Sequence, residues 1–155
     1  MTTAAMTSPT PAARPFRLAI VGSRSLDGHS DALRVIRSVL DAYLARHAVL
    51  VVVSGGAVGI DQMAADEACR RGLQVVEHRP VSVGWWHYRE RNLRIAQDCD
   101  ELVRIADPRS LTYGSGWTRD RARELGRLTT GYTITGRPPE PCRRVGTELR
   151  GKSDA

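Results

Sequence analysis

The sequence has almost no lysine and no long apolar segment. Lys152 is the only lysine, yet the 155 residues carry a formal net charge of +6 and a pI of about 9.9, so nearly all the positive charge comes from arginine. Arginine suits bidentate recognition of phosphate, although abundant arginine and alanine are also typical of a GC-rich genome. No apolar run approaches the roughly 18 residues that span a bilayer, so we expect no membrane partner.

The few cysteines and histidines argue against disulfides and metal sites. Cys69, Cys99 and Cys142 form an odd set without zinc-ligand spacing, which predicts reduced thiols in a cytoplasmic protein. The four histidines also lack metal-ligand spacing, so we expect no metal and no cofactor. The leader, residues 1–15, lacks the apolar stretch of a signal peptide and is predicted to be disordered, and residues 136–155 are predicted to form a flexible tail.

The region between them, residues 16–135, alternates short apolar runs with segments of helical periodicity. The runs predict strands at 16–21, 49–53, 73–77, 101–105 and 128–135, and the periodic segments predict helices at 31–47, 60–71, 88–98 and 118–126. Ser30 or Asp31 is the expected cap of the first helix. This order predicts an α/β fold, a single Rossmann-like doubly wound parallel sheet of about five strands with helices on both faces. Ligands in such sheets bind outside the carboxyl ends of the strands.

The segment Ser54–Asp61 is the first candidate for a ligand-binding loop. Its glycines allow close approach of the backbone to a ligand, and the helix that follows offers free N–H groups and a positive dipole end. These features predict an anion cradle, although the segment matches neither standard phosphate-binding glycine motif. A tight strand-to-helix turn explains the same glycines equally well. Asp61 is either a ribose ligand or a first-turn carboxylate that stabilises the helix dipole.

Three further loops end or follow predicted strands. Gly22-Ser23-Arg24 closes the first strand and offers a guanidinium for phosphate. Trp85 and Trp86 are expected in a loop before Arg89-Glu90-Arg91-Asn92, a combination that suits a phosphorylated base. Gly114-Ser115-Gly116-Trp117-Thr118 is expected to repeat the first glycine loop, with Thr118 as the helix cap. Each has a plain structural alternative: a solvated arginine, a charged helix face, or a turn.

These motifs, in this order, resemble the SLOG superfamily. That group includes the DNA-processing protein A family, the Lonely Guy phosphoribohydrolases and stand-alone nucleotide-sensor domains of the YspA type. The resemblance covers about Leu18 to Gly126, and its most specific part is Val53–Asp61. It implies a nucleotide-related ligand and a homodimer formed through helices that flank the sheet.

The resemblance to the Lonely Guy enzymes is partial. Glu90-Arg91-Asn92 fills the position of their ERK triplet, with asparagine in place of lysine, and Gly114–Thr118 resembles their glycine loop. Three residues past Thr118, where those enzymes carry a glutamate, this chain has Arg121. Asp120 is about 100° away around the helix, so it does not point the same way. The resemblance thus implies that Arg91 and Thr118 contact a ligand and that the catalytic carboxylate is missing.

Three functions remain open from the sequence. The first is a sensor or carrier for a nucleotide or phosphoribosyl compound, bound by Gly22, Ser23, Arg24, Ser54, Gly55, Gly56, Gly59, Asp61, Trp86, Arg91, Asn92, Gly116 and Thr118. The second is a nucleoside-monophosphate N-glycosidase that uses Asp61, Glu90 and Arg91, with Asp120 a further carboxylate. The third is a single-stranded DNA-binding protein, which the basic charge favours and the lack of an aromatic-interleaved basic stripe disfavours.

Overall fold

A computed structural model describes residues 14–110 and 114–135 of the chain. The predicted leader at 1–15, apart from its last two residues, and the predicted tail at 136–155 lie outside the described residues. The elements follow the order β1 (Phe16–Gly22), α1 (Ser30–Arg46), β2 (Leu50–Ser54), α2 (Ile60–Arg70), β3 (Gln74–Glu77), α3 (Trp85–Asp98), β4 (Glu101–Ala106), α4 (Gly114–Glu124) and β5 (Leu128–Thr133), with a short 3-10 helix, η1 (Arg24–Leu26), after β1.

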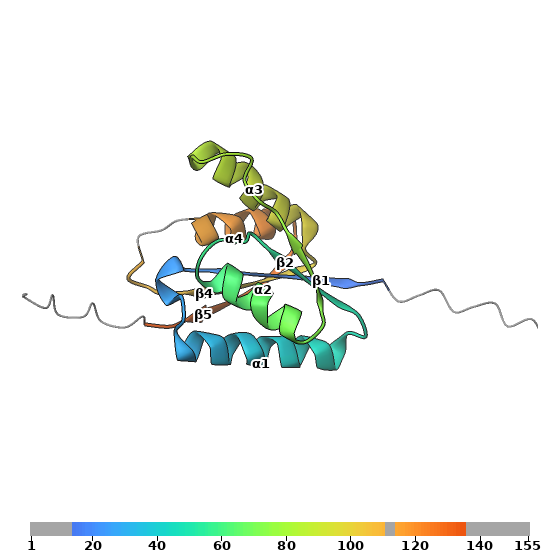
Figure 1. Cartoon of the computed structure of the whole chain (residues 1–155). Coiled ribbons are helices and arrows are strands. Elements are labelled where there is room, and N and C mark those ends of the chain that lie inside the picture. Colours follow the sequence, from blue (N-terminus) through green and yellow to red (C-terminus); the bar gives the residue numbers. More distant parts are fainter. Residues whose placement is uncertain (1–13, 111–113, 136–155) are drawn as a thin grey trace, which may run out of the picture.

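The five strands form one parallel sheet in the order β3-β2-β1-β4-β5. The chain builds outward from β1 to β3 and then crosses back to the other side of β1, so β1 and β4 lie at the point where the strand order reverses. α1 and α2 cover one face of the sheet, and α3 and α4 cover the other (Figure 1). The predicted fold class is therefore confirmed.

The two faces of the sheet are packed by alternating residues of the same strands. In β1, Leu18 and Ile20 belong to the core beneath α1 and α2, whereas Ala19 and Val21 belong to the core beneath α3 and α4. This alternation follows from the two-residue period of a strand. Both cores exclude water from the central strands, which are apolar on both faces because helices cover both sides.

Three helix starts differ from the sequence prediction. α1 is capped by His29, whose Nδ1 accepts a hydrogen bond from the Asp31 N–H, and neither Ser30 nor Asp31 is the cap. α3 begins at Trp85, so both tryptophans lie in its first turn and not in a loop. α4 begins at Gly114, so the predicted second glycine loop is the first turn of a helix.

Thr118 accordingly lies inside α4 and is not its cap. Its hydroxyl donates to the Gly114 carbonyl oxygen at 2.8 Å, which is the contact of a residue one turn into a helix. The remaining predicted boundaries agree with the structure within one or two residues. Gly72, with φ of +73°, follows the end of α2, a position where glycine is common because it adopts a positive φ without strain.

Candidate functional site

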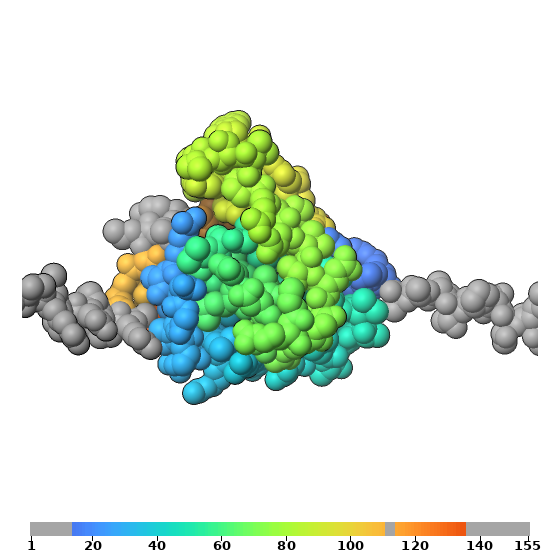
Figure 2. All heavy atoms as spheres, in the orientation of Figure 1, coloured from blue at the N-terminus to red at the C-terminus, as the bar shows by residue number. Residues whose placement is uncertain are grey.

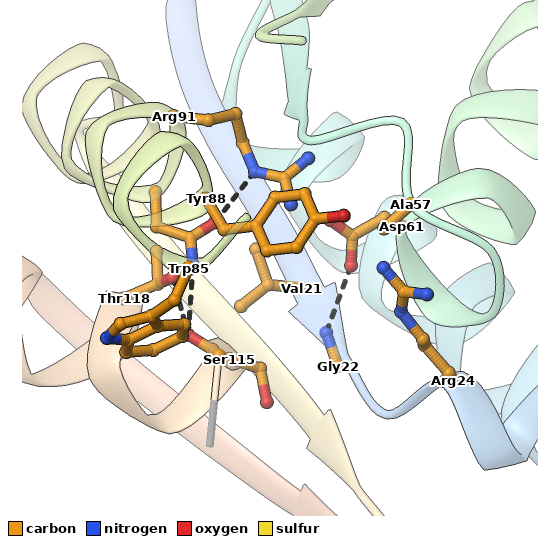
Figure 3. Close-up of a pocket in the computed structure, with 12 residues that line it drawn as sticks. Val21, Gly22, Arg24, Ala57, Asp61, Trp85, Tyr88, Arg91, Ser115 and Thr118 are labelled. Atoms are coloured by element: carbon orange, nitrogen blue, oxygen red, sulfur yellow. Dashed lines mark hydrogen bonds between the residues drawn. The ribbon is translucent and has the colours of Figure 1, made fainter. Parts of the chain in front are cut away.

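A cavity of about 620 Å³ lies where the carboxyl ends of β1 and β2 meet the first turns of α3 and α4 (Figure 3). This is the crevice in which ligands of doubly wound sheets bind, and its size is within the usual range for small-molecule sites. The residues that line it are Val21, Gly22, Arg24, Ala57, Asp61, Trp85, Tyr88, Arg91, Asn92, Gly114, Ser115 and Thr118.

The floor of the cavity forms where two strand-to-helix connections touch. A Cβ on Gly22 would lie 2.0 Å from the Ile105 carbonyl oxygen, so only glycine fits at this end of β1. Gly59 has φ of +101°, and a Cβ there would lie 2.6 Å from the Arg24 Cα. These two glycines therefore allow the connection after β2 to approach the connection after β1.

The glycine-rich segment Ser54–Asp61 acts mainly as a tight turn. The Ser54 hydroxyl donates to the Asp61 carbonyl oxygen at 3.1 Å and accepts from the Gly56 N–H at 3.1 Å. Gly55 has no room for a side chain because a Cβ would lie 2.8 Å from an Asp61 carboxylate oxygen. Only Ala57 and Asp61 of this segment line the cavity, so the backbone here serves chiefly to place the Asp61 carboxylate.

Asp61 is a buried acid at the edge of the cavity. Its Oδ1 accepts a hydrogen bond from the Gly22 N–H at 3.3 Å, as Figure 3 shows. Burial raises its pKa to about 6, against the opposing effects of the Arg91 charge and of backbone N–H donors. A carboxyl group of this kind changes its protonation state near neutral pH and is suited to accept or hold a proton.

Arg91 is a buried cation that faces the cavity from α3. Its Nε donates to the Asn92 Oδ1 at 2.8 Å, and its Nη1 donates to the Gly55 carbonyl oxygen. Burial lowers the pKa of Arg91, and the charge of Arg24 lowers it further, while Asp61 raises it. Two guanidinium groups and one carboxylate are the charged groups of the lining, so the cavity attracts anions.

Asn92 holds the first turn of α4 against α3, and Thr118 stabilises the same turn from within α4. The Asn92 side-chain amide donates to the Gly114 carbonyl oxygen at 3.4 Å, and the Thr118 hydroxyl donates to the same oxygen. Because Asn92 also accepts from Arg91, the guanidinium and the start of α4 are linked through one side chain. Asn92 and Thr118 are therefore positioning residues whose polar groups are already engaged in this structure.

Two aromatic side chains line the cavity, and sequence reasoning selected neither. Trp85 and Tyr88 lie on the same face of α3 as Asn92, at spacings of three and four residues. Trp86, the predicted stacking residue, does not line the cavity and is 67% exposed. If the predicted helix had begun one turn earlier, the helical spacing from Trp85 to Asn92 would have identified the tryptophan that lines the cavity.

Six of the predicted site residues line the cavity and eight do not. The six are Gly22, Arg24, Asp61, Arg91, Asn92 and Thr118. The eight others are Ser23, Ser54, Gly55, Gly56, Gly59, Trp86, Glu90 and Gly116. Sequence reasoning missed Val21, Ala57, Trp85, Tyr88, Gly114 and Ser115.

Several of the eight have local roles that the structure makes plain. The Ser23 hydroxyl accepts from the Asp107 N–H at 3.0 Å and joins the connections after β1 and β4. Gly56 has φ of +65° and faces the Glu77 carboxylate. Glu90 is exposed on α3. Gly116 lies in α4 beside the Arg104 guanidinium.

Arg121 does not face the cavity. Its guanidinium pairs with Glu124 at 2.7 Å on the surface of α4. The arginine at the position where the Lonely Guy enzymes carry a glutamate therefore places its charge outside the cavity, in an intrahelical pair with Glu124.

Metal-ligating side chains do not cluster in the described part of the chain, and no helix there is long and apolar enough to cross a bilayer. No curated protein matches the sequence. A solved structure described as the X-ray structure of TM1055, a structural genomics target, shares 20% sequence identity with a TM-score of 0.55, over 74% of this chain and 72% of that one. This likeness supports the fold.

The family assignment comes from the amino-terminal half of the domain. Residues 16–82 match the model of the YspA, cpYpsA-related SLOG family. The match contains β1, η1, α1, β2, α2 and β3, and with them the two glycine-dependent connections that form the floor of the cavity. Residues 16–82 of this chain are thus similar to the YspA, cpYpsA-related SLOG family.

Proposed function

We propose that this domain binds a phosphorylated nucleotide or phosphoribosyl compound in the cavity at the carboxyl ends of β1 and β2, beside the first turns of α3 and α4. The observation that carries the proposal is that Arg24 and Arg91 both line the cavity, where the positive charge of Arg24 contributes to lowering the pKa of Arg91. A bound phosphate relieves this repulsion and accepts bidentate hydrogen bonds from guanidinium groups. The family match supports a nucleotide-related function.

The rest of the lining fits the other parts of a nucleotide. Trp85 and Tyr88 offer aromatic faces on which a base stacks. Asp61 supplies a buried carboxylate that accepts hydrogen bonds from ribose hydroxyl groups. The arrangement thus has a cationic part, an aromatic part and one acceptor.

Calorimetric titration of a nucleoside and its 5′-monophosphate tests this proposal. We expect the monophosphate to bind at least tenfold more tightly to the parent protein, and Arg24→Gln to remove most of that difference. Arg24 is exposed and makes no ion pair within the described residues, so its substitution leaves the fold intact. Arg34→Gln, which removes an exposed guanidinium from α1, is the matched control and retains the preference. Equal binding of nucleoside and monophosphate by the parent would contradict the proposal.

Hydrolysis of the base–ribose bond is a second candidate function, and Asp61 favours it. This side chain is the only carboxylate among the lining residues, and its pKa of about 6 suits a general acid or base. Glu90 and Asp120, the other carboxylates proposed from sequence, are exposed outside the cavity.

Chromatography of AMP, GMP, CMP and UMP after long incubation tests the second candidate. Release of free base by the parent that disappears in Asp61→Asn would establish an enzyme. Glu90→Gln serves as the control and retains any activity. Binding without base release in the parent is the result that the sensor or carrier function predicts.

A further inference from the structure

Four side chains on the outer surface of α3 and α4 form a tryptophan–arginine strip, defined as Trp86, Arg89, Trp117 and Arg121. The Arg89 guanidinium carbon lies 5.8 Å from the centre of the Trp86 ring and 5.3 Å from the centre of the Trp117 ring. The Arg121 guanidinium carbon lies 5.1 Å from the Trp117 ring centre. The strip thus crosses from one helix to the other through cation–π contacts.

The strip borders the cavity because both come from the same helical turns. On α3, Trp85 and Tyr88 line the cavity, and their neighbours in sequence, Trp86 and Arg89, belong to the strip. On α4, Thr118 lines the cavity and Trp117 belongs to the strip. A ligand that extends out of the cavity along the first turns of these helices would therefore contact the indole and guanidinium groups of the strip.

The strip is not explained by packing of the fold. Trp86 is 67% exposed, and the first turn of α3 stands out from the rest of the surface (Figure 2). Arg89 has no carboxylate partner within the described residues, whereas Arg121 pairs with Glu124. An exposed indole beside an unpaired guanidinium offers both a stacking surface and a positive charge.

We propose that the tryptophan–arginine strip binds a second nucleobase, so that the preferred ligand carries two bases joined through phosphate. This inference rests on the proposed function, which places the first nucleotide in the cavity. The second base stacks on the exposed indole, and Arg89 lies beside the linking phosphate. Stacking of one base on an aromatic side chain contributes about 1–3 kcal/mol, so the second base is expected to tighten binding about 5- to 150-fold.

Competition calorimetry with three probes tests the inference. AMP is the one-base reference, a 5′-phosphorylated adenylate dinucleotide with a 3′,5′ linkage is the first two-base probe, and 5′,5′-linked diadenosine diphosphate is the second. We expect at least one two-base probe to bind the parent 5- to 150-fold more tightly than AMP, and the better of the two identifies the linkage. Trp86→Leu and Arg89→Gln should reduce this ratio to near one without weakening AMP binding.

Arg94→Gln is the matched control, because it removes an exposed arginine from α3 outside the strip and should preserve the ratio. Equal affinity of the parent for AMP and both two-base probes would overturn the inference and leave the proposed function standing. A loss of dimer mass in light scattering of Trp86→Leu, with the ratio unchanged, would overturn it in favour of an interface between two copies of the chain. Absence of binding by all three probes would overturn both proposals.

Discussion

The two faces of the sheet differ in what their helices contribute. Beneath α1 and α2 the core contains large side chains that are fully buried, among them Leu18, Ile36 and Leu40. Beneath α3 and α4 the core is smaller and combines Ile95 and Leu102 with Ala96 and Ala122. These two helices also bring buried polar groups to the cavity, which are Arg91, Asn92 and Thr118. Stability is therefore concentrated on one face of the sheet, and the candidate site is built mainly on the other.

Among the variants that compare the two faces, Leu40→Ala is expected to cause the largest loss of unfolding free energy. Leu40 is fully buried in the core beneath α1 and α2, and removal of a leucine side chain from such a core costs about 2–5 kcal/mol. Chemical denaturation should show this loss, whereas calorimetry below the melting transition should show unchanged nucleotide affinity. A tenfold loss of affinity would mean that this face also sets the geometry of the site.

Asp61→Asn tests the buried acid at the edge of the cavity through pH. The folded-state pKa of Asp61, about 6, is above the value of 3.8 for an unperturbed side chain. The stabilising effect of the bound proton is present below pH 4 and is lost as the pH rises through 6. A pKa difference of about two between the folded and unfolded states corresponds to about 3 kcal/mol in the free energy of unfolding.

Denaturation of parent and Asp61→Asn at pH 4 and at pH 7 measures this difference. The parent should lose up to about 3 kcal/mol of unfolding free energy between these pH values relative to the variant, because the amide does not titrate. Parallel pH profiles for the two proteins would show that Asp61 ionises freely in the folded state.

Asn92→Ala should have a smaller effect on stability and a clear effect on binding. The variant removes one of two hydrogen bonds to the Gly114 carbonyl oxygen and the acceptor of the Arg91 Nε, at a cost of about 1–3 kcal/mol. We expect weaker nucleotide binding, because Arg91 loses the side chain that orients it. Asn92→Asp keeps the acceptor for Arg91 and should retain more affinity than Asn92→Ala in the same titration.

Arg37→Gln is expected to have the smallest effect. Arg37 Nε pairs with a Glu67 carboxylate oxygen at 3.3 Å, and the arginine side chain is half exposed. Exposed pairs contribute up to about 1 kcal/mol, and Glu67 retains its contact with Arg71. The melting temperature should fall by no more than a few degrees, with no change in nucleotide affinity. A larger fall would show that this ion-pair network contributes to the core beneath α1 and α2.

The strands of the sheet could be predicted from sequence because each one corresponds to a short continuous run of apolar residues. In the run Leu50–Ser54, each residue before the final serine is apolar. A strand that is covered by helices on both faces has such a continuous apolar run, because its side chains are buried on both sides. The helix starts could not be predicted in the same way. α4 begins in Gly114, Ser115 and Gly116, which have low helix propensity. Its first turn is held by Asn92, which comes from α3, and by Thr118 of α4 itself.

Three of the predicted residues that line the cavity lie close to strand ends. Gly22 ends β1, Arg24 comes two residues later, and Asp61 lies in the first turn of the helix after β2. Parallel strands bring their carboxyl ends to one edge, which is why these residues could be predicted. The choice between Trp85 and Trp86 depended on where α3 begins, and this helix packs against α4, which is distant in the sequence. The tryptophan–arginine strip joins residues from two helices, so no stripe is visible in the linear sequence.

Native mass spectrometry of the purified protein, before and after addition of millimolar nucleotides, tests the central claim most directly. We predict an adduct with the mass of a phosphorylated nucleotide on the parent, and its loss or weakening in Arg24→Gln, with Arg34→Gln behaving like the parent. An unliganded parent at every nucleotide concentration, or an adduct that survives equally in Arg24→Gln, would contradict the assignment of this cavity as a nucleotide phosphate site.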